Sequence, residues 1–167
     1  MQIDFLVNAC KSTSNNNEFG LCDDPAPANN AAYIDEKNKS NWIGIVKNVH
    51  NYEIEFIAID NCIDIRKPDG SLESRCDGLL NFENNLIFVE LKCRGYGQWL
   101  KKGREQLANT INIFKLHYDI SQYNVVFGNV CNSLKPQSHV GHATNIQQFY
   151  DATGFVLKSD RIIEIQA

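Results

Sequence analysis

The feature that most constrains the fold is a run of four apolar residues, 86–89, that leads directly into Glu90 and Lys92. Four apolar residues in succession favour a β-strand that is covered on both faces. Side chains alternate along a strand, so Glu90 and Lys92 share one face. A charged side chain beside an interior strand is costly unless it is paired, hydrogen-bonded or bound to a metal. The pattern therefore indicates a polar site at a buried strand end, and a metal-assisted active site would account for it.

A third charged residue, Asp77, belongs to the preceding predicted strand, residues 75–82. Residues 83–85 read Glu-Asn-Asn, which favours a turn between the two strands. Folding about this turn places Asp77 opposite or diagonal to Glu90 or Lys92, and the loop length leaves the partner open. Two adjacent carboxylates repel each other, and a hard cation such as Mg²⁺ relieves that repulsion. Lys92 would then hold a water molecule or stabilise charge on a phosphate oxygen.

The triplet of an acid, any residue and a lysine is not specific by itself. Residues 35–37 form a second such triplet, in a polar stretch without a strand pattern. Context distinguishes residues 90–92, because an aspartate on the previous strand, a short hairpin and a following helix accompany them. The alternative is a surface hairpin whose exposed end carries an ordinary Glu–Lys pair.

Asp77, twelve intervening residues, Glu90, one further residue and Lys92 resemble the signature of the PD-(D/E)XK nuclease superfamily. Cys76 stands where a proline usually precedes the aspartate, a departure that many members tolerate. Residues 42–113 are further similar to small uncharacterised bacterial members of this superfamily. The resemblance implies a restriction-endonuclease-like core and hydrolysis of phosphodiester bonds, in DNA, with Mg²⁺ or Mn²⁺ as the cofactor.

The resemblance also implies roles for individual residues. A helix after the signature often carries a glutamine in this superfamily, and Gln106 is the matching residue here. The metal would be held by Asp77, by Glu90 and by the backbone carbonyl of Leu91. The catalytic residues would be Asp77, Glu90, Lys92 and Gln106. Members often carry a further acid on an N-terminal helix, for which Glu36 is a poor match, and Asp60 could supply an additional carboxylate.

The formal net charge of −4 argues against a surface that is basic throughout, but it does not exclude a local basic groove. Such a cluster follows the signature and would track a nucleic-acid backbone; its members are Arg94, Lys101, Lys102 and Arg104. The alternative for these residues is an ordinary solvated helix face. Tyr96 and Trp99 lie among them and could stack on bases, although such aromatic residues more often belong to the core or its rim.

The chain has 167 residues and 43% hydrophobic content, which fits one domain, residues 1–167, with a substantial core. Residues 11–41 are rich in Asn, Ser, Asp and Pro and predict an irregular N-terminal segment, and residues 42–132 form the predicted core. Strands are predicted at residues 42–47, 52–60, 75–82, 86–93 and 124–130, with a helix at residues 98–117. This order predicts an α/β fold with a mixed central sheet flanked by helices. The strand after the helix should run parallel to the Glu90 strand.

The C-terminal part predicts further elements. Thr144 and Gln147 form a capping-box pattern that opens a short helix, which should end near Gly154. Residues 155–157 and 161–165 predict a closing hairpin. His139 and His142 have a spacing that can bind metal on a helix, but the glycine between them favours a loop, and no ligand role is expected.

Six cysteines show no Cys-x-x-Cys pair and no zinc-like spacing. The first residues lack the segments of a secretory signal, and no apolar run reaches membrane-spanning length. We therefore expect a cytoplasmic protein with free thiols and no membrane contact. Cys76 and Cys93 each neighbour a proposed site residue and should point into the core, with a disulfide between them as the alternative.

The sequence leaves two questions of function open. A catalytically silent domain of the same fold, which binds nucleic acid or a protein partner, is the alternative to a nuclease. The low basic content and the missing N-terminal acid favour that alternative. Two subunits pairing as a homodimer would suit a chain of this size if both strands of a duplex are cut.

Overall fold

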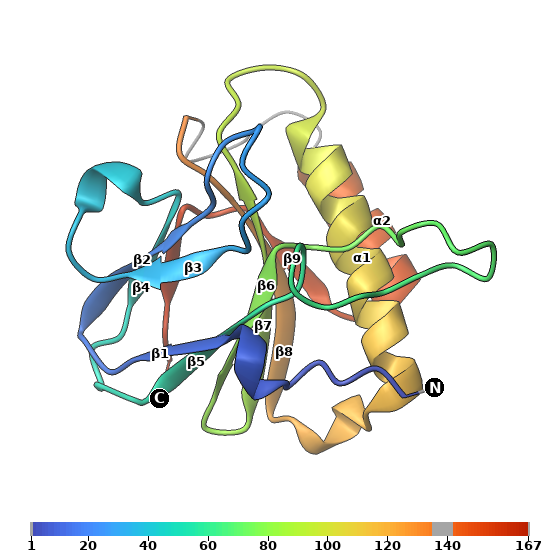
Figure 1. Ribbon diagram of the computed structural model, residues 1–167, viewed down its shortest axis with the longest axis horizontal. Coiled ribbons are helices and arrows are strands. Elements are labelled where there is room, and N and C mark those ends of the chain that lie inside the picture. Colours follow the sequence, from blue (N-terminus) through green and yellow to red (C-terminus); the bar gives the residue numbers. More distant parts are fainter. Residues whose placement is uncertain (1, 135–141, 167) are drawn as a thin grey trace.

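The computed structural model describes residues 2–134 and 142–166, which form two β-sheets and two α-helices in three layers (Figure 1). The first sheet has the strand order β1 (Lys11–Ser14), β5 (Ile54–Ala58), β6 (Gly78–Phe82), β7 (Asn85–Lys92), β8 (Val125–Asn132) and β9 (Val156–Lys158). The second has the order β10 (Ile162–Glu164), β4 (Gly44–Lys47), β2 (Glu18–Cys22) and β3 (Tyr33–Asp35). The helices α1 (Trp99–His117) and α2 (His142–Thr153) cover the first sheet, on the face away from the second (Figure 1).

The first sheet is mixed, as the order of predicted elements requires. Strands β1, β5, β6 and β7 pair antiparallel, whereas β7, β8 and β9 pair parallel. Helix α1 supplies the crossover between β7 and β8, whose register runs from Asn85 with Val125 to Lys92 with Asn132. The α/β fold with a mixed central sheet is therefore confirmed, while the restriction-endonuclease-like core stays a prediction.

Strand β7 lies at the centre of the molecule and is buried on both faces. Phe88 packs in a core cluster with Leu107 and Ile111 of α1, whereas Val89 packs in a second cluster between the two sheets. Glu90 shares the face of Phe88 and so lies under α1. The helix comes close there because Gly103 has no side chain: a Cβ atom at this position would lie 2.9 Å from Val130 and 3.4 Å from Glu90.

The turn between β6 and β7 fixes the register on which the site depends. Phe82 pairs with Asn85, so only Glu83 and Asn84 connect the strands, and both have positive φ angles, of 43° and 60°. Two successive residues with positive φ form the hairpin turn whose twist matches that of its strands. Asn84 adopts this conformation more easily than most residues, and its side chain is held by the carbonyl of Gln122. A two-residue loop leaves no freedom for a register shift.

The segment predicted to be irregular, residues 11–41, instead carries three strands. Strand β1 is an edge of the first sheet, and β2 and β3 form half of the second. Each of these strands has three to five residues, too few for a visible alternation, and long-range partners provide their pairing. In β2, Gly20 is required because the indole of Trp42 occupies the space of its missing side chain.

Two expected pairs of neighbouring strands are divided between the sheets. Strands β4 and β5 follow each other in the chain, yet β4 pairs with β2 and β5 pairs with β1 and β6. The expected C-terminal hairpin is wrong, because β9 pairs with β8 and β10 pairs with β4, both in parallel. The hydrophobic residue at the centre of each strand explains the division: Leu157 packs in the core beneath the helices and Ile163 packs between the sheets.

The expected C-terminal helix is present as α2, and it ends before Gly154, which has a φ angle of +81°. His139 lies outside the described residues, and His142 is the first residue of α2, where its ring contacts the Ser159 hydroxyl. No helix in the described part of the chain is long and apolar enough to cross a membrane.

The expectation of free thiols is wrong for two of the six cysteines, because Cys10 and Cys62 form a disulfide. The antiparallel pairing of Lys11 with Ile57 explains it, since the residue before β1 then meets the segment after β5. Cys76 is buried in the core as expected, but Cys93 is exposed, so no disulfide joins these two. Cys93 follows the last residue of β7, where the chain leaves the sheet and alternation no longer applies.

Replacing Cys10 and Cys62 together by serine is expected to lower the free energy of unfolding by about 2–4 kcal/mol, because the unfolded chain loses a covalent loop closure. Urea denaturation without reductant measures this difference. The matched control is Cys93→Ser, which removes an exposed free thiol and should leave the stability unchanged. Equal stability of the double variant and the wild type would show that the bond does not form.

Candidate active site

Two carboxyl groups lie side by side where β6 begins and β7 ends. The last registered pair between these strands is Gly78 with Val89, so Asp77 lies beside Glu90, one of the arrangements that the sequence left open. The Leu91 amide donates a hydrogen bond of 2.6 Å to Oδ2 of Asp77 and fixes its carboxyl group. Both acids are buried, with 7% of Asp77 and 2% of Glu90 exposed. Burying two neighbouring acids destabilises a protein, so the pair is unexpected unless it has a functional use.

Glu90 is paired on one oxygen only. Its Oε1 lies 2.7 Å from the ammonium group of Lys92. The other oxygen, Oε2, is buried and has no hydrogen-bond partner among the described residues. A buried carboxylate oxygen without a partner is rare and calls for an explanation, such as an ion that is not part of the structure.

Lys92 is held from a second side by α1. Its ammonium group donates a hydrogen bond of 2.8 Å to Oε1 of Gln106, and the Gln106 amide nitrogen donates in turn to the carbonyl of Arg75, at 3.2 Å. Thr110 continues the contact, since its hydroxyl accepts from the Cys76 amide and donates to the carbonyl of Gln106. Gln106 thus lies at the site, as expected, but its amide positions Lys92 instead of facing a water molecule or a phosphate.

The electrostatic environment favours the protonated acids. Burial, followed by the charge of Glu90, raises the pKa of Asp77 well above its usual value. Burial likewise raises the pKa of Glu90 to about 7, although the neighbouring Lys92 ammonium acts in the opposite direction. The pair therefore carries less than two full negative charges near neutral pH unless a cation compensates it.

The donor set fits a hard divalent cation. Within the described residues no three His, Cys, Asp or Glu side chains form a metal-ligand group, so the fit to an ion depends on two carboxylates and a backbone oxygen. The amide of Leu91 points to Asp77, and in an extended strand the carbonyl of the same residue points to the same side, past the start of β6. Two carboxylates and one carbonyl are oxygen ligands of the type that Mg²⁺ prefers, and the buried Oε2 of Glu90 has no hydrogen-bond partner among the described residues.

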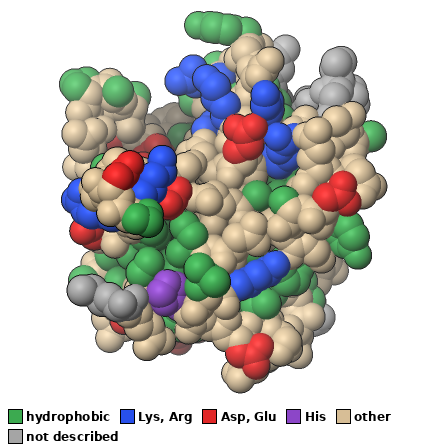
Figure 2. Space-filling model, turned by 90° about the vertical axis from the view of Figure 1, so that its right-hand side faces the viewer, with side chains coloured by type: hydrophobic (Ala, Val, Ile, Leu, Met, Phe, Trp, Pro, Cys, Tyr) green, Lys and Arg blue, Asp and Glu red, His purple; other side chains and the backbone are tan. Residues whose placement is uncertain are grey.

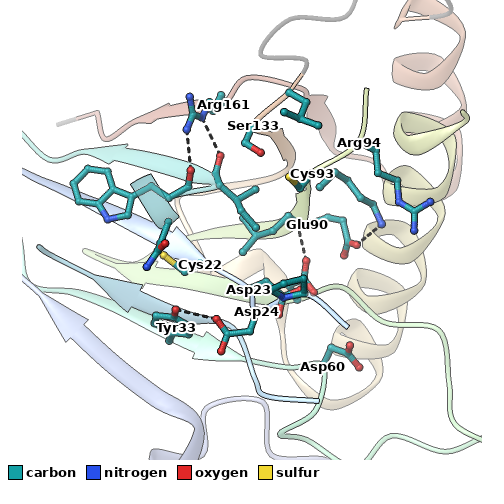
Figure 3. A pocket seen from close by; sticks show the side chains of 18 of the residues that line it. Cys22, Asp23, Asp24, Tyr33, Asp60, Glu90, Cys93, Arg94, Ser133 and Arg161 are labelled. Carbon is teal, nitrogen blue, oxygen red and sulfur yellow. Dashed lines mark hydrogen bonds and ion pairs between the residues drawn. The ribbon is translucent and has the colours of Figure 1, made fainter. Parts of the chain in front are cut away.

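The carboxyl pair opens into a cleft of about 840 Å³ (Figure 3). One wall comes from the first sheet and contains Asp77, Glu90 and Lys92. The second sheet and the loops beside it line the rest of the cleft, where Asp23 and Asp24 follow β2. Asp23 lies near enough to Asp77 and Lys92 for their charges to interact. Figure 3 shows these two aspartates on one side of the pocket and Arg94 on the other, toward α1. The site is therefore a recess between two sheets and not an open surface.

Asp23 and Asp24 are the site residues that sequence reasoning missed. Asp23 is half-buried, and burial, followed by the charges of Asp60 and Asp24, raises its pKa. Asp24 accepts hydrogen bonds from Tyr33 and Asn30, each at 3.1 Å. The available signal was two consecutive acids directly after the apolar end of residues 18–22.

The other acids considered from sequence have different surroundings. Asp60 lines the cleft, but its carboxylate forms an ion pair of 2.8 Å with Arg75, whose side chain is nearly buried. Glu36 accepts a hydrogen bond of 2.5 Å from Ser14 and does not line the cleft. Its proposed equivalence to an N-terminal metal ligand therefore has no support in the fold.

The four predicted nucleic-acid-binding residues separate into two groups. Arg94 lines the cleft and, with Lys102 and Lys92, also lines a smaller adjoining recess. Lys101 is exposed on α1. Arg104 is turned away, because its guanidinium donates to Asn145 and Gln148 of α2. Figure 2 shows Lys and Arg side chains gathered at the end of the molecule where α1 begins.

Comparison with protein-family models, with curated proteins and with solved structures finds no match to this chain. Its function therefore has to be inferred from the chemistry of the site.

The raised pKa of Glu90 predicts how stability depends on pH. Its pKa of about 7 in the folded protein exceeds the usual glutamate pKa of 4.5, so this group destabilises the metal-free protein as pH rises through that interval. Glu90→Gln cannot ionise and should reduce the loss of unfolding free energy between pH 5 and pH 8 by about 1–3 kcal/mol. Urea denaturation in EDTA at both pH values measures it.

The matched control for this prediction is Glu53→Gln, which changes an exposed glutamate before β5 and should keep the wild-type pH dependence. An unchanged pH dependence in Glu90→Gln would mean that the carboxyl group titrates normally and is not held in a desolvated pair.

Proposed function

We propose that this protein is a Mg²⁺-dependent nuclease, also active with Mn²⁺, that hydrolyses phosphodiester bonds in DNA. The observation that carries the proposal is the buried pair of Asp77 and Glu90, which lines a cleft together with the fixed ammonium group of Lys92. Two acids and a lysine in this arrangement match the spacing of the PD-(D/E)XK signature that the sequence resembles. A structural ion pair between Glu90 and Lys92 would require neither a second buried acid nor an unpartnered oxygen on Glu90.

Asp77, Glu90 and the carbonyl of Leu91 would hold the metal. A cation bound there would acidify an attacking water molecule and offset charge on the phosphate oxygens. Glu90 has two tasks, because Oε1 keeps Lys92 at the site while Oε2 is left for the ion. The Leu91 amide keeps Asp77 aligned by its hydrogen bond.

Lys92 would act on the reacting groups. An ammonium group has three donors, and Glu90 and Gln106 accept two of them. The third is left for a water molecule or a phosphate oxygen in the cleft, where a fixed positive charge stabilises the developing negative charge. Gln106 is a positioning residue in this proposal, since it contacts Lys92 and the Arg75 carbonyl.

The DNA backbone would be contacted by Arg94, Lys101 and Lys102, which lie along the start of α1 and the loop before it. Arg104 would contribute to the packing of α1 on α2 instead. Because these contacts are few, we expect modest, salt-sensitive binding without broad coverage of the duplex.

A DNA substrate favours the cytoplasm as the location of this protein. The Cys10–Cys62 disulfide weighs against that location, because disulfides rarely persist in reducing compartments.

The first test of the proposal is metal binding. Isothermal titration calorimetry of the wild type with Mn²⁺ should show one binding event that strengthens between pH 6 and pH 8, because the acids must lose their protons to bind the ion. Asp77→Asn should abolish binding. The control Asp64→Asn, at an exposed aspartate paired with Arg66, should bind as the wild type does. Wild-type affinity in Asp77→Asn would exclude this metal site.

The second test is cleavage. Purified protein with Mg²⁺ should cut plasmid DNA, and EDTA should stop the reaction. Asp77→Ala and Lys92→Ala should each slow cleavage by about 100-fold or more, the usual cost of removing one charge-stabilising group. Lys67→Ala, at an exposed lysine in a distant turn, is the control and should cut normally.

Cleavage that survives both Asp77→Ala and Lys92→Ala would come from a contaminant and would refute the assignment. Metal binding without any cleavage would favour the alternative, a silent domain of this fold that binds nucleic acid or a protein partner.

A further inference from the structure

The charges around the cleft are arranged unequally. On the side of the second sheet, Asp23 and Asp24 line the cleft. The cation on that side, Arg161, is already engaged, since its guanidinium donates to the carbonyls of Trp42 and Ile43. The Arg161 guanidinium is fixed at these carbonyls, so a phosphate that approached Asp24 would meet a carboxylate that no ion pair among the described residues neutralises.

The opposite side of the cleft is basic and continues past its edge. Lys92 and Arg94 line both the cleft and the smaller recess, of about 110 Å³, which Lys102 also lines. Tyr96 lines this recess too, and its side chain is 86% exposed. An exposed aromatic ring beside three cations is the combination that proteins use for single strands, with phosphates on the cations and a base on the ring.

The enclosure of the acids adds a steric constraint. Glu90, which is 2% exposed, lines a cleft of about 840 Å³, a volume in the size range of small-molecule pockets. A duplex would bring a second phosphate backbone toward the side of the cleft that carries Asp24, the acidic wall. A single strand brings one backbone, which the basic side accommodates. One of its bases can stack on Tyr96, while others turn toward Asp24.

We propose that the substrate of this site is single-stranded DNA, bound with its phosphates along Lys92, Arg94 and Lys102 and its bases toward Asp24. The proposal rests on the proposed function, because it specifies the substrate of the same site.

The acidic wall further selects among bases. Asp24 is held by Tyr33 on one oxygen and by Asn30 on the other, and each carboxylate oxygen can accept one more hydrogen bond. Cytosine, adenine and guanine carry an exocyclic amino group with two N–H donors that can reach such an oxygen, whereas thymine has only its ring N3–H. Strands of cytosine should therefore bind more tightly than strands of thymine.

Fluorescence anisotropy with Ca²⁺ in place of Mg²⁺ tests binding separately from cleavage. A labelled mixed-sequence strand of about 12 nucleotides, within the usual site sizes, is compared with the same strand annealed to its complement. The single strand should bind at least about tenfold more tightly. Equal or tighter binding of the duplex, or no binding of either, overturns the proposal.

Variants separate the roles of the two walls. Tyr96→Ala should weaken single-strand binding about fivefold or more, whereas Tyr150→Ala, at an exposed tyrosine on α2, should not. Asp24→Asn should reduce the preference for oligo-dC over oligo-dT, because an amide can donate to thymine as well as accept. Asp64→Asn should keep that preference. An unchanged preference in Asp24→Asn overturns the assignment of the base-facing wall.

Cleavage of the same oligonucleotides with Mg²⁺ distinguishes failure of this proposal from failure of the proposed function. Equal cleavage of the single strand and the duplex leaves the nuclease assignment intact and overturns the single-strand preference. Tight binding of the single strand without cleavage leaves the substrate assignment intact and overturns the nuclease.

Discussion

The structure depends on the burial of two neighbouring acids at one end of a central strand pair. The two-residue turn between β6 and β7 sets the register that brings Asp77 beside Glu90, and it does so from the far end of the hairpin. Burial then raises the pKa of both groups, because it disfavours their ionised forms. Such an arrangement costs stability and is retained where it serves a site.

The surroundings of the acids reduce that cost without removing it. Lys92 pairs with one oxygen of Glu90 and is itself fixed by Gln106, which α1 brings into reach. Gly103 allows the helix to approach the sheet closely enough for this contact. One oxygen of Glu90 nevertheless stays without a partner. The contacts thus fix the geometry of the two acids and leave one buried oxygen of Glu90 unsatisfied within the described part of the chain.

Sequence reasoning succeeded where the determining interactions are local. The hairpin of β6 and β7, the helix α1 and the parallel strand β8 follow from short-range patterns of apolar residues and turns. It failed where distant segments meet. The strands within residues 11–35 are short and depend on β4 and β5 for pairing, and β9 and β10 join different sheets. The Cys10–Cys62 bond likewise depends on the pairing of β1 with β5.

The sequence by itself determined the α/β class and placed Asp77, Glu90 and Lys92 near one another, because strand alternation and the short hairpin fix their relation. Only the resemblance to the PD-(D/E)XK signature pointed to Gln106. Only the tertiary structure showed that a second sheet forms. This sheet brings Asp23 and Asp24 to the end of the first sheet, where they line the cleft. The tertiary structure also decided that the Arg104 guanidinium donates a hydrogen bond to Asn145 of α2 and is directed away from the site. Contacts between segments far apart in the chain have no signature in local pattern, since their partners are chosen by packing.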